Sequence, residues 1–407
     1  MTESGGLRKA YRTILGDHFP PGMEISFVMP GGERQTLVYE KVGWEIDGDT
    51  KGLRYGENPD QEAALYKPVN GRLKLGDVHT IQLGRWLASD TELLQSGKHP
   101  GKINITDADA ALGMLRYFPD KPTVAIMKHN NPSGVARREI LTNAYIAARM
   151  ADRIAAYGGT VALNRTVDMD TANEIAESYL EVVVAPEFEQ GVMGVFEAKK
   201  DLRVMRIGAM ERLQDWDGAM VPEFKTLIDG GQIVQWPYVP KARTKMDLRV
   251  VTARQPTESE YRDMLFGWLV EAGVTSNSVL YVRDETTLGI GTGQQDRLYV
   301  ASDTVAKAQG KMADRIAWET YRKPFVGLDP TEQGEIMKSP RVREVLKGAS
   351  MVSDGFFPFA DGAEAGIRAG VTAIVQPGGS KRDDEVIAAC NGSNVAMAFT
   401  GQRSFRH

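Results

Sequence analysis

The sequence KHNNPSG at residues 128–134 contains the side chains best suited to proton transfer in this chain. Histidine titrates near neutrality, so His129 could accept or donate a proton during a reaction. The adjacent Lys128 could stabilise negative charge that develops in a transition state. The apolar run 123–127 predicts a buried strand just before the motif, and open α/β sheets bind ligands beyond the carboxyl ends of strands. A polar surface turn explains these residues equally well, because Asn-Pro and Ser-Gly pairs are common in turns.

Two further sets of residues could bind an anionic nucleotide. LRYGENP places Arg54, whose planar guanidinium fork suits phosphate, beside Tyr55, which could stack on a base. SNS and GIGTGQQDR contain Asn277 and Arg297 close to glycines that would let a ligand approach the backbone. The alternatives are an ordinary turn for the first set and a glycine-rich hairpin for the second.

Motifs near the C-terminus could form an aromatic slot and an anion site. In SDGFFPFAD, Phe356 and Phe359 could line a slot for a flat heterocycle, with Asp361 hydrogen-bonding to its polar edge. In QPGGSKRD, Ser380 lies where a strand is expected to lead into a helix, whose free N–H groups favour anions. An aromatic plug in the core and an ordinary strand-to-helix connection are the alternatives. The final residues FTGQRSFRH, which include Arg403, stay aromatic and basic to the end, and this indicates a docked C-terminus.

The composition excludes several classes of protein. At roughly 100–200 residues per domain, 407 residues allow two or three domains. A net charge of -5 does not give the basic surface typical of nucleic-acid-binding proteins. The single cysteine, Cys390, excludes a disulfide framework within one chain, and the five histidines lack the spacing of zinc ligands. Because no apolar stretch is long enough for a signal peptide or a membrane span, we expect a cytoplasmic protein without zinc, nucleic-acid or membrane partners.

Apolar runs alternate with helical patterns along the chain, which predicts an α/β fold with a mainly parallel sheet. A hairpin is expected around the Pro-Gly-Gly sequence within residues 23–42. Strands are expected at 123–127, 160–163, 182–185, 278–282 and 372–375. Helices are expected at 143–156, 171–180, 303–321 and 383–390.

The sequence MADRIA occurs at residues 150–155 and again at residues 312–317. Either two alanine-rich helices are similar by chance, or the chain contains two related α/β subdomains. Residues 200–245 lie between the two copies and have an irregular pattern with scattered Trp and Pro. This stretch could bridge two subdomains.

Taken in order, the motifs resemble the AICAR transformylase domain of the bifunctional AICAR transformylase/IMP cyclohydrolase enzymes of purine biosynthesis. The resemblance implies two tandem cytidine-deaminase-like α/β/α subdomains without zinc, at 51–200 and 246–407, joined by a bridge at 201–245. It also implies a homodimer whose active sites lie across the subunit interface. Residues 1–50 are expected to be an N-terminal extension in place of the family's cyclohydrolase domain, so that a separate cyclohydrolase would close the ring. The matching motifs, in chain order, are LRYGENPDQ, KHNNPSG, GGTVALN, VVVAPEF, SNSV, GIGTGQQDR, SDGFFPFADG, QPGGSKRD and FTGQRSFRH.

The resemblance implies transfer of a formyl group from 10-formyltetrahydrofolate to the 5-amino group of AICAR, giving FAICAR. His129 corresponds to the family's proton acceptor, and Lys128 corresponds to the lysine that stabilises the oxyanion. Asn277 is implied as a third catalytic residue, which positions the carboxamide of the substrate. The implied substrate-binding residues are Arg54, Tyr55, Glu181, Arg297, Phe356, Phe359, Asp361, Ser380 and Arg403.

The chain departs from the family pattern at two positions that bear on its ligands. Glu181 stands where some members have Asp, so the acidic character is kept. Some members bind potassium near the SNS and SDxF motifs, and Ser276, Ser278 and Asp354 could supply oxygen ligands here. However, Val274 replaces a residue that carries an oxygen in those members.

Two alternative functions are consistent with the resemblance. One is a catalytically silent protein that binds AICAR or another nucleotide, although Lys128, His129 and Asn277 are all retained. The other is a formyltransferase with a different formyl donor, such as formate activated by ATP, although no P-loop pattern supports it. A nucleoside deaminase is disfavoured because the HxE and CxxC zinc-ligand motifs are missing.

Overall fold

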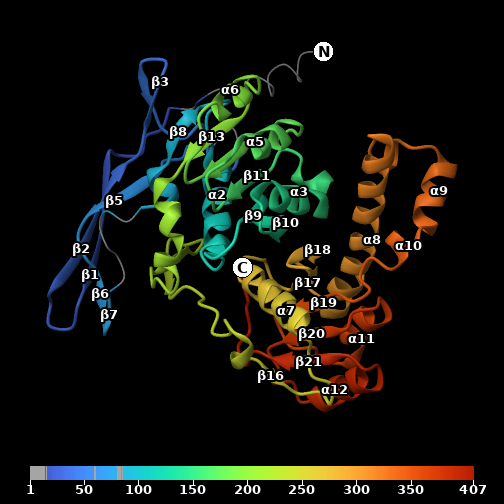
Figure 1. The fold of residues 1–407 in the computed structure, drawn as a ribbon. Coiled ribbons are helices and arrows are strands. Elements are labelled where there is room, and N and C mark those ends of the chain that lie inside the picture. Colours follow the sequence, from blue (N-terminus) through green and yellow to red (C-terminus); the bar gives the residue numbers. More distant parts are fainter. Residues whose placement is uncertain (1–13, 15, 59–60, 80–83, 85) are drawn as a thin grey trace.

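Figure 1 shows the computed structural model, which describes residues 14, 16–58, 61–79, 84 and 86–407. A mixed sheet runs through this part of the chain and carries helices on both faces. From one edge to the other, its strands are β16 (Arg249–Val250), β21 (Ala396–Phe399), β20 (Ala373–Gln376), β19 (Ser350–Ser353), β17 (Val279–Arg283), β18 (Thr286–Gly291), β10 (Asn131–Arg137), β9 (Thr123–Lys128), β11 (Thr160–Leu163), β12 (Val182–Ala185), β13 (Arg203–Arg206) and β8 (Glu92–Gln95).

The two halves of this sheet have the same topology. Read inwards from each outer edge, β8, β13, β12, β11, β9 and β10 correspond to β16, β21, β20, β19, β17 and β18. Each half contains an antiparallel hairpin and two parallel strand pairs. The halves meet where β10 pairs with β18. Both MADRIA sequences follow the hairpin of their half, so the topology supports two related subdomains rather than a chance similarity.

The prediction of a mainly parallel sheet is wrong, because each half contains one parallel region and an antiparallel hairpin, and the two hairpins lie side by side in the middle of the sheet. After the turn at residues 129–130, the chain returns as β10, antiparallel to β9. It then crosses to β11, which also runs antiparallel to β9. Among the described strands of this sheet, only β11–β12–β13 and β19–β20–β21 are parallel. The polar motif KHNNPSG therefore contains a turn and the start of a strand.

Helices form a layer on each face of the sheet. Helices α2 (Lys102–Leu115) and α7 (Glu258–Glu271) cover one face and share one hydrophobic core with it. The remaining helices of the two halves pack on the opposite face, where each half has its own core. These are α3 (Leu141–Ala151), α4 (Arg153–Ala156), α5 (Met169–Ala176) and α6 (Val192–Glu197) in the first half, and α8 (Arg297–Tyr321), α11 (Ala360–Arg368) and α12 (Asp383–Gly392) in the second.

Capping aspartates set two helix boundaries that differ from the predicted ones. The helix predicted after β10 divides into α3 and α4 at Asp152, whose side chain accepts a hydrogen bond from the Ala155 N–H over 2.9 Å. The long helix of the second half begins before its predicted start, because Asp296 caps it by accepting the Tyr299 N–H over 2.6 Å. This early start places Arg297 in the first turn of α8.

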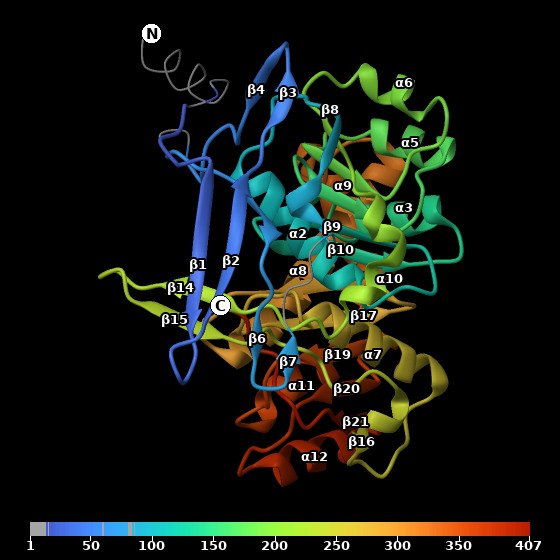
Figure 2. The same cartoon turned by 90° about the vertical axis from the view of Figure 1, so that its left-hand side faces the viewer.

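A small separate sheet stands along one side of the molecule (Figure 2). It contains β1 (Gly22–Val28), β2 (Arg34–Lys41) and β5 (Tyr66–Asn70). The turn between β1 and β2 lies at the predicted glycines, since Gly31 and Gly32 both have positive φ.

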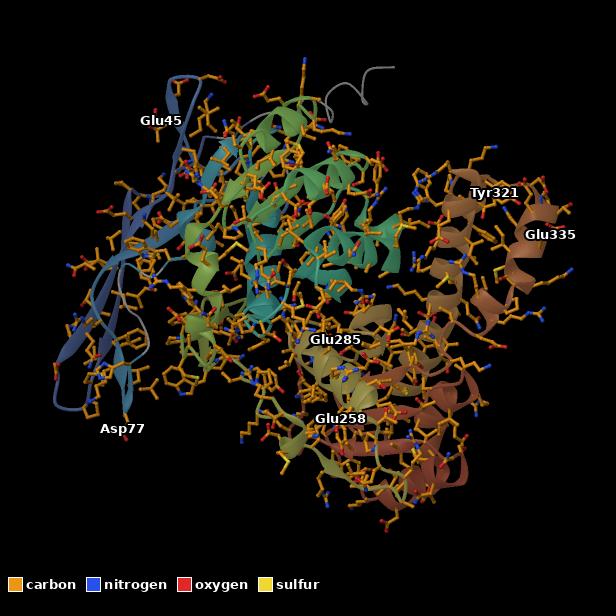
Figure 3. The ribbon with its side chains drawn as sticks, viewed as in Figure 1. Glu45, Asp77, Glu258, Glu285, Tyr321 and Glu335 are labelled. Atoms are coloured by element: carbon orange, nitrogen blue, oxygen red, sulfur yellow. The ribbon has the colours of Figure 1, made fainter. Side chains whose placement is uncertain are left out.

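Shorter elements connect and extend these sheets. Figure 3 shows Tyr321 and Glu335 on the arm that α8 and the following helices form at one side of the second half. No helix in the described part of the chain is long and apolar enough to cross a membrane. The shorter elements are β3 (Trp44–Ile46), β4 (Asp49–Lys51), β6 (Lys74–Leu75), β7 (Val78–His79), β14 (Glu223–Thr226), β15 (Gln232–Gln235), α9 (Pro330–Lys338), α10 (Pro340–Arg343) and the 3₁₀ segments η1 (Ala88–Asp90), η2 (Gly208–Trp216), η3 (Lys245–Asp247) and η4 (Phe325–Gly327).

Candidate active site

The Lys128–His129 pair lies where β9 turns into β10. His129 and Asn130 have φ angles of 54° and 59°, the left-handed conformation that reverses a chain within two residues. Lys128 is the last residue of β9, and the exposed His129 begins the turn. The pair thus follows the carboxyl end of its own strand, as predicted. Because β9 is antiparallel to β11, however, this turn lies beside the amino ends of β11 and β12.

A pocket of about 300 Å³ opens beside this turn and is called the Lys128 pocket below. Five residues implied by the family resemblance line it, namely Arg54, Tyr55, Lys128, His129 and Glu181. The rest of its wall comes from the segment that follows Tyr55, from the start of α2 and from the residues before β11. Pro59 and Asp60 of the LRYGENPDQ motif lie outside the described residues.

Two backbone carbonyls hold the ammonium group of Lys128. Its Nζ donates hydrogen bonds to the carbonyl oxygens of Tyr157 and Gly158, over 3.2 and 2.9 Å. Gly158 has a φ of 69°, and a Cβ atom there would lie 3.1 Å from the lysine Nζ. Glycine suits this position both for its left-handed backbone and for the close approach of the lysine. An ammonium group has three N–H donors, so the third can face a ligand.

Arg54 and Tyr55 form one wall of the Lys128 pocket. The Arg54 Nη2 donates a hydrogen bond to the Tyr55 hydroxyl over 2.7 Å, and the guanidinium carbon lies 4.4 Å from the centre of the Tyr55 ring. Its Nη1 donates to the carbonyl oxygen of Lys98 over 3.2 Å. The wall therefore combines a fixed cation with an aromatic face, which suits a phosphate and a base.

Glu181 contributes negative charge to the Lys128 pocket. Its carboxylate lies 3.5 Å from Arg203 Nη1 and accepts a hydrogen bond from the Asn104 side chain over 3.4 Å. Arg203 is only 1% exposed. Burial lowers the pKa of Arg203 to about 10, the nearby charge of Arg54 adds to this, and Glu181 opposes it. Glu181 thus balances a buried cation behind the pocket.

The sequence analysis missed Asp107, which lines the same pocket from α2. Its carboxylate is 4% exposed and accepts a hydrogen bond from the backbone N–H of Asn130 over 2.7 Å. Burial raises the pKa of Asp107, while this hydrogen bond and the charges of His129 and Lys128 oppose the rise. One feature of the sequence could have pointed to Asp107. It and Asn104 are polar residues on the otherwise apolar buried face of α2.

Asn277, Arg297 and Asp354 form a second hydrogen-bonded group, called the Arg297 cluster below. Arg297 donates to the Asn277 side-chain oxygen through Nη2 and to the Asp354 carboxylate through Nη1. It also donates to the Ser353 hydroxyl over 2.9 Å. Asn277 in turn donates to the carbonyl oxygen of Gln294 over 2.9 Å. Arg297 therefore joins the SNS, GIGTGQQDR and SDGFFPFAD motifs.

The aromatic motif has a buried part and an exposed part. Phe357 is fully buried, and its N–H donates a hydrogen bond to the Gln376 side chain over 3.0 Å. Phe356 and Phe359 are 44% and 48% exposed, and Asp361 is exposed in the first turn of α11. Phe357 is thus part of the core, whereas the Phe356 and Phe359 rings are about half exposed. The Arg382 guanidinium carbon lies 4.6 Å from the centre of the Phe359 ring.

Ser380 and Arg403 lie on the segments that follow β20 and β21. The Ser380 hydroxyl accepts a hydrogen bond from the Arg382 N–H over 3.2 Å. The guanidinium groups of Arg403 and Arg297 lie 4.7 and 6.0 Å from the centre of the Phe405 ring. Since β19, β20 and β21 are parallel, their carboxyl ends bring these motifs to the same edge of the sheet as the Arg297 cluster.

The Lys128 pocket and the Arg297 cluster are connected through the residues after the His129 turn. The Asn131 side chain accepts hydrogen bonds from the Thr275 N–H and the Thr292 hydroxyl, over 2.9 and 3.0 Å. Arg406 donates to the Asn130 carbonyl over 2.8 Å, so the C-terminus is docked as predicted. All residues that line the pocket nevertheless lie between 54 and 181. Within one chain, the Arg297 cluster therefore does not line the Lys128 pocket.

The oxygen atoms expected for potassium lie around a buried carboxyl group. The Ser276 hydroxyl donates to Asp354, and the Ser278 hydroxyl donates to Glu271. The second oxygen of Glu271 is buried without a hydrogen-bond partner among the described residues. Burial raises the pKa of Glu271 well above its ordinary value, and Asp354 adds to the effect. Hydroxyl and carboxyl oxygens are ligands that suit potassium, so these residues fit such an ion.

Among the described residues, no group of three or more His, Cys, Asp or Glu side chains is arranged to hold a metal ion.

The comparisons with known proteins agree on one family. The family model described as the AICARFT/IMPCHase bienzyme matches residues 27–307. The bifunctional purine biosynthesis protein PurH of Magnetococcus marinus is 37% identical over 381 residues, which cover 92% of this chain and 61% of that protein. The protein of the same name from a Ruegeria species is 40% identical over 357 residues, which cover 87% of this chain and 59% of that protein. This chain thus spans about three fifths of the length of these relatives. Because the matched region is more than half of the chain, the chain belongs to the AICARFT/IMPCHase bienzyme family.

Proposed function

We propose that this chain transfers a formyl group from 10-formyltetrahydrofolate to the 5-amino group of AICAR, giving FAICAR. The observation that carries the proposal is the Lys128 pocket, where an exposed imidazole and a held ammonium group lie beside Arg54 and Tyr55. Membership of the AICARFT/IMPCHase family supports the choice of substrate and donor. Cytidine-deaminase-like subdomains belong to the same proposal, and the matching halves of the sheet support a duplication.

Proton transfer is the main difficulty of this reaction. The lone pair of the AICAR amine is delocalised into the imidazole and carboxamide, so the amine is a weak nucleophile. As the amine nitrogen attacks the formyl carbon, His129 accepts the proton that the nitrogen loses. The formyl oxygen becomes an oxyanion, which the third N–H of the Lys128 ammonium stabilises. The oxyanion then re-forms the C=O bond, the bond from the formyl carbon to the folate nitrogen breaks, and that nitrogen takes up the proton that His129 holds.

The remaining residues are proposed to bind and orient the substrates. Arg54 and Tyr55 bind the nucleotide, and Glu181 accepts a hydrogen bond from it. Asn277 and Arg297 position the carboxamide. The rest of the proposed binding residues contact the base, the folate or the phosphate, and these are Phe356, Phe359, Asp361, Ser380 and Arg403.

A homodimer follows from the same proposal. The Arg297 cluster does not line the Lys128 pocket of its own chain, although both carry residues that the reaction needs. A second copy of the chain would bring its Arg297 cluster to this pocket, and a two-fold axis would create two equivalent sites.

Potassium, where bound, would be held by Ser276, Ser278 and Asp354, and its charge would balance the buried carboxylates.

The test is incubation of the purified chain with AICAR and 10-formyltetrahydrofolate, with tetrahydrofolate followed by absorbance and the nucleotide product identified by mass spectrometry. We expect one formyl group to be added to AICAR for each tetrahydrofolate formed. No turnover at any potassium concentration would contradict the proposal. Formylation with formate and ATP alone would identify a different donor. Binding of AICAR without turnover with either donor would indicate a catalytically silent binding protein.

A further inference from the structure

Both halves of the chain use a buried aspartate to hold the turn of their hairpin. The turn at residues 129–130 and the turn at residues 284–285 have positive φ at both positions. Asp107 is the sixth residue of α2 and Asp263 is the sixth residue of α7, and each helix has 14 residues. The two side chains are 4% and 5% exposed. The same feature therefore occurs at matching positions in the two halves of the fold.

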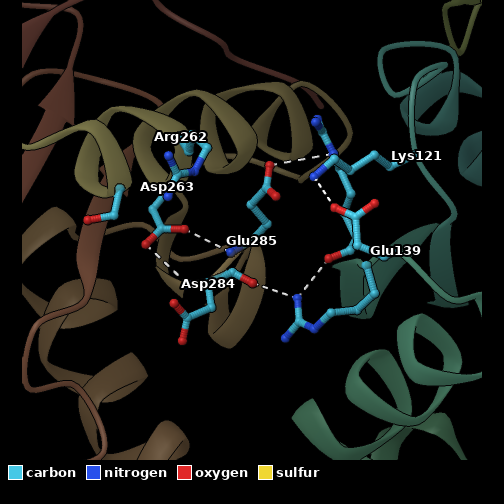
Figure 4. Close-up of a pocket in the computed structure, with 9 residues that line it drawn as sticks. Lys121, Glu139, Arg262, Asp263, Asp284 and Glu285 are labelled. Atoms are coloured by element: carbon cyan, nitrogen blue, oxygen red, sulfur yellow. Dashed lines mark hydrogen bonds and ion pairs between the residues drawn. The ribbon is translucent and has the colours of Figure 1, made fainter.

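The hydrogen bonds of the two aspartates are of the same kind. Asp107 accepts the backbone N–H of Asn130, the second residue of its turn, over 2.7 Å. Asp263 accepts the N–H groups of Asp284 and Glu285 over 3.1 and 2.8 Å, as Figure 4 shows. Each carboxylate thereby helps to fix the orientation of its turn.

The surroundings of the two turns differ. Burial raises the pKa of Asp107, and the charges of His129 and Lys128 oppose the rise. Burial also raises the pKa of Asp263, but the acidic side chains of its own turn add to the rise. The second turn lines an open cleft of about 600 Å³ together with Lys121, Glu139 and Arg262, and no histidine lines that cleft. Asp263 thus only holds a turn, whereas Asp107 also lies beside a pair of groups suited to proton transfer.

We propose that Asp107 is a positioning residue for formyl transfer, because it fixes the turn that carries His129 and keeps a negative charge beside the Lys128–His129 pair. This inference rests on the proposed function. When His129 accepts the proton of the amine it becomes a cation, and a neighbouring carboxylate stabilises that cation relative to the neutral ring. A base that is oriented by a third group is a recurring arrangement in enzymes.

The test compares Asp107→Asn with the matched control Asp263→Asn in the full chain. Asparagine keeps the size of the side chain and one acceptor oxygen, which is enough for the Asn130 N–H, whereas Asp263→Asn loses one of its two hydrogen bonds and is the more severe change for its turn. In Asp107→Asn, kcat should fall roughly 10-fold or more, part of the 10²–10⁴ that proton transfer contributes, with little change in the KM for AICAR. The acid limb of the pH profile of kcat should also move to lower pH, because without the carboxylate the protonated form of His129 is less favoured. In Asp263→Asn, kcat and the pH profile should match the wild type.

A second readout needs no substrate. The chain has five histidines, so their ring resonances can be followed by NMR, and His129→Gln assigns the resonance of His129. In Asp107→Asn, the midpoint of that resonance should move to lower pH, because the substitution removes a neighbouring negative charge. Asp263→Asn should leave it unchanged. The other charged groups of the pocket, Arg54, Glu57, Lys128 and Glu181, are the same in all variants.

The outcomes separate this inference from the proposed function. Equal loss of kcat in both aspartate variants, or an unchanged His129 midpoint in Asp107→Asn, would overturn the role of Asp107. A wild-type chain without turnover would overturn the proposed function instead, and the NMR titration would still decide whether Asp107 acts on His129.

Discussion

The direction of the Lys128 ammonium group depends on a single glycine. Two carbonyl oxygens, from Tyr157 and Gly158, accept its hydrogen bonds, and the chain can approach the lysine so closely because residue 158 has no side chain. The left-handed φ of 69° adds a second reason for glycine at this position. A small change at residue 158 should therefore displace the group that is proposed to stabilise the oxyanion.

Gly158→Ala tests this at the scale of one residue. The new methyl group would lie 3.1 Å from the lysine Nζ, so the lysine must move. We expect kcat to fall roughly 10–100-fold, since misplacement of a catalytic group by about 1 Å has this effect. Steady-state kinetics measure it. Gly113→Ala is the control, because a Cβ atom there meets nothing within 4 Å, and it should keep wild-type kcat. An unchanged kcat in Gly158→Ala would show that the lysine does not act from this position.

Some residues of the Lys128 pocket can be predicted from the sequence, and others cannot. Lys128 and His129 can be recognised because a basic pair directly after an apolar strand has no role in a core. Asp107 is harder to recognise, because two polar residues on the apolar face of a helix, Asn104 and Asp107, do not by themselves indicate a site. Its partner is a backbone N–H, and sequence does not show which turn lies against which helix face.

At the scale of elements, the prediction is right for five strands of the large sheet, namely β9, β11, β12, β17 and β20, and it leaves out the others. The buried runs 160–163 and 182–185 are β11 and β12 as predicted, because fully buried parallel strands are continuously apolar. Strand β10 was not predicted, because Asn, Pro and Gly in its first half favour turns and the pairing with β9 is irregular there. Its pairing with β9 on one side and with β18 on the other stabilises it as a strand.

His99 connects the segment that contains Gly52 to strand β13 through hydrogen bonds. Its burial makes the stability of the fold sensitive to acid. Its ring donates to the Gly52 carbonyl, and its own carbonyl accepts from Arg203 of β13 over 3.1 Å. Burial lowers the pKa of His99, the hydrogen bond to Gly52 opposes this, and Arg54 and Arg203 add to the lowering. As pH falls below the ordinary pKa of histidine, the His99 ring is protonated in the unfolded chain before it is protonated in the folded chain. The free energy of unfolding must therefore fall in that range.

The variant His99→Asn removes this titration. Asparagine tolerates the positive φ of 63° at this position. Between about pH 7.5 and pH 5.5, the variant should lose about 1 kcal/mol less of its free energy of unfolding than the wild type, measured by urea denaturation. Equal losses in the two proteins would mean that His99 is not held neutral in the fold.

At the scale of the whole molecule, the two halves of matching topology explain why the proposed site residues form two separate groups. The first half carries its residues at the hairpin turn, and the second half carries its residues at the carboxyl ends of β19, β20 and β21. The MADRIA copies also contact each other across the halves, since Arg153 pairs with Asp314 over 2.9 Å. The repeated sequence indicated a duplication, but it could not show that the Arg297 cluster does not line the Lys128 pocket of its own chain.

The proposed dimer can be tested by mixing two inactive variants. His129→Ala damages the Lys128 pocket, and Arg297→Ala damages the Arg297 cluster. If each active site combines a pocket from one subunit with a cluster from the other, a mixed dimer has one intact site. Unfolding and refolding the two variants together should then restore about a quarter of wild-type activity, because half of the dimers are mixed. Each variant refolded alone is the control. No recovery in the mixture would indicate that each site is built within one chain.

The most direct test of the account as a whole is the rate of tetrahydrofolate formation by wild type and by His129→Gln, measured with saturating AICAR and 10-formyltetrahydrofolate. The account predicts turnover by the wild type and a kcat that is lower by roughly 10²–10⁴ in the variant, the usual contribution of a general base, with a similar KM for AICAR. Near-normal turnover by the variant would contradict the role of His129 as the proton acceptor.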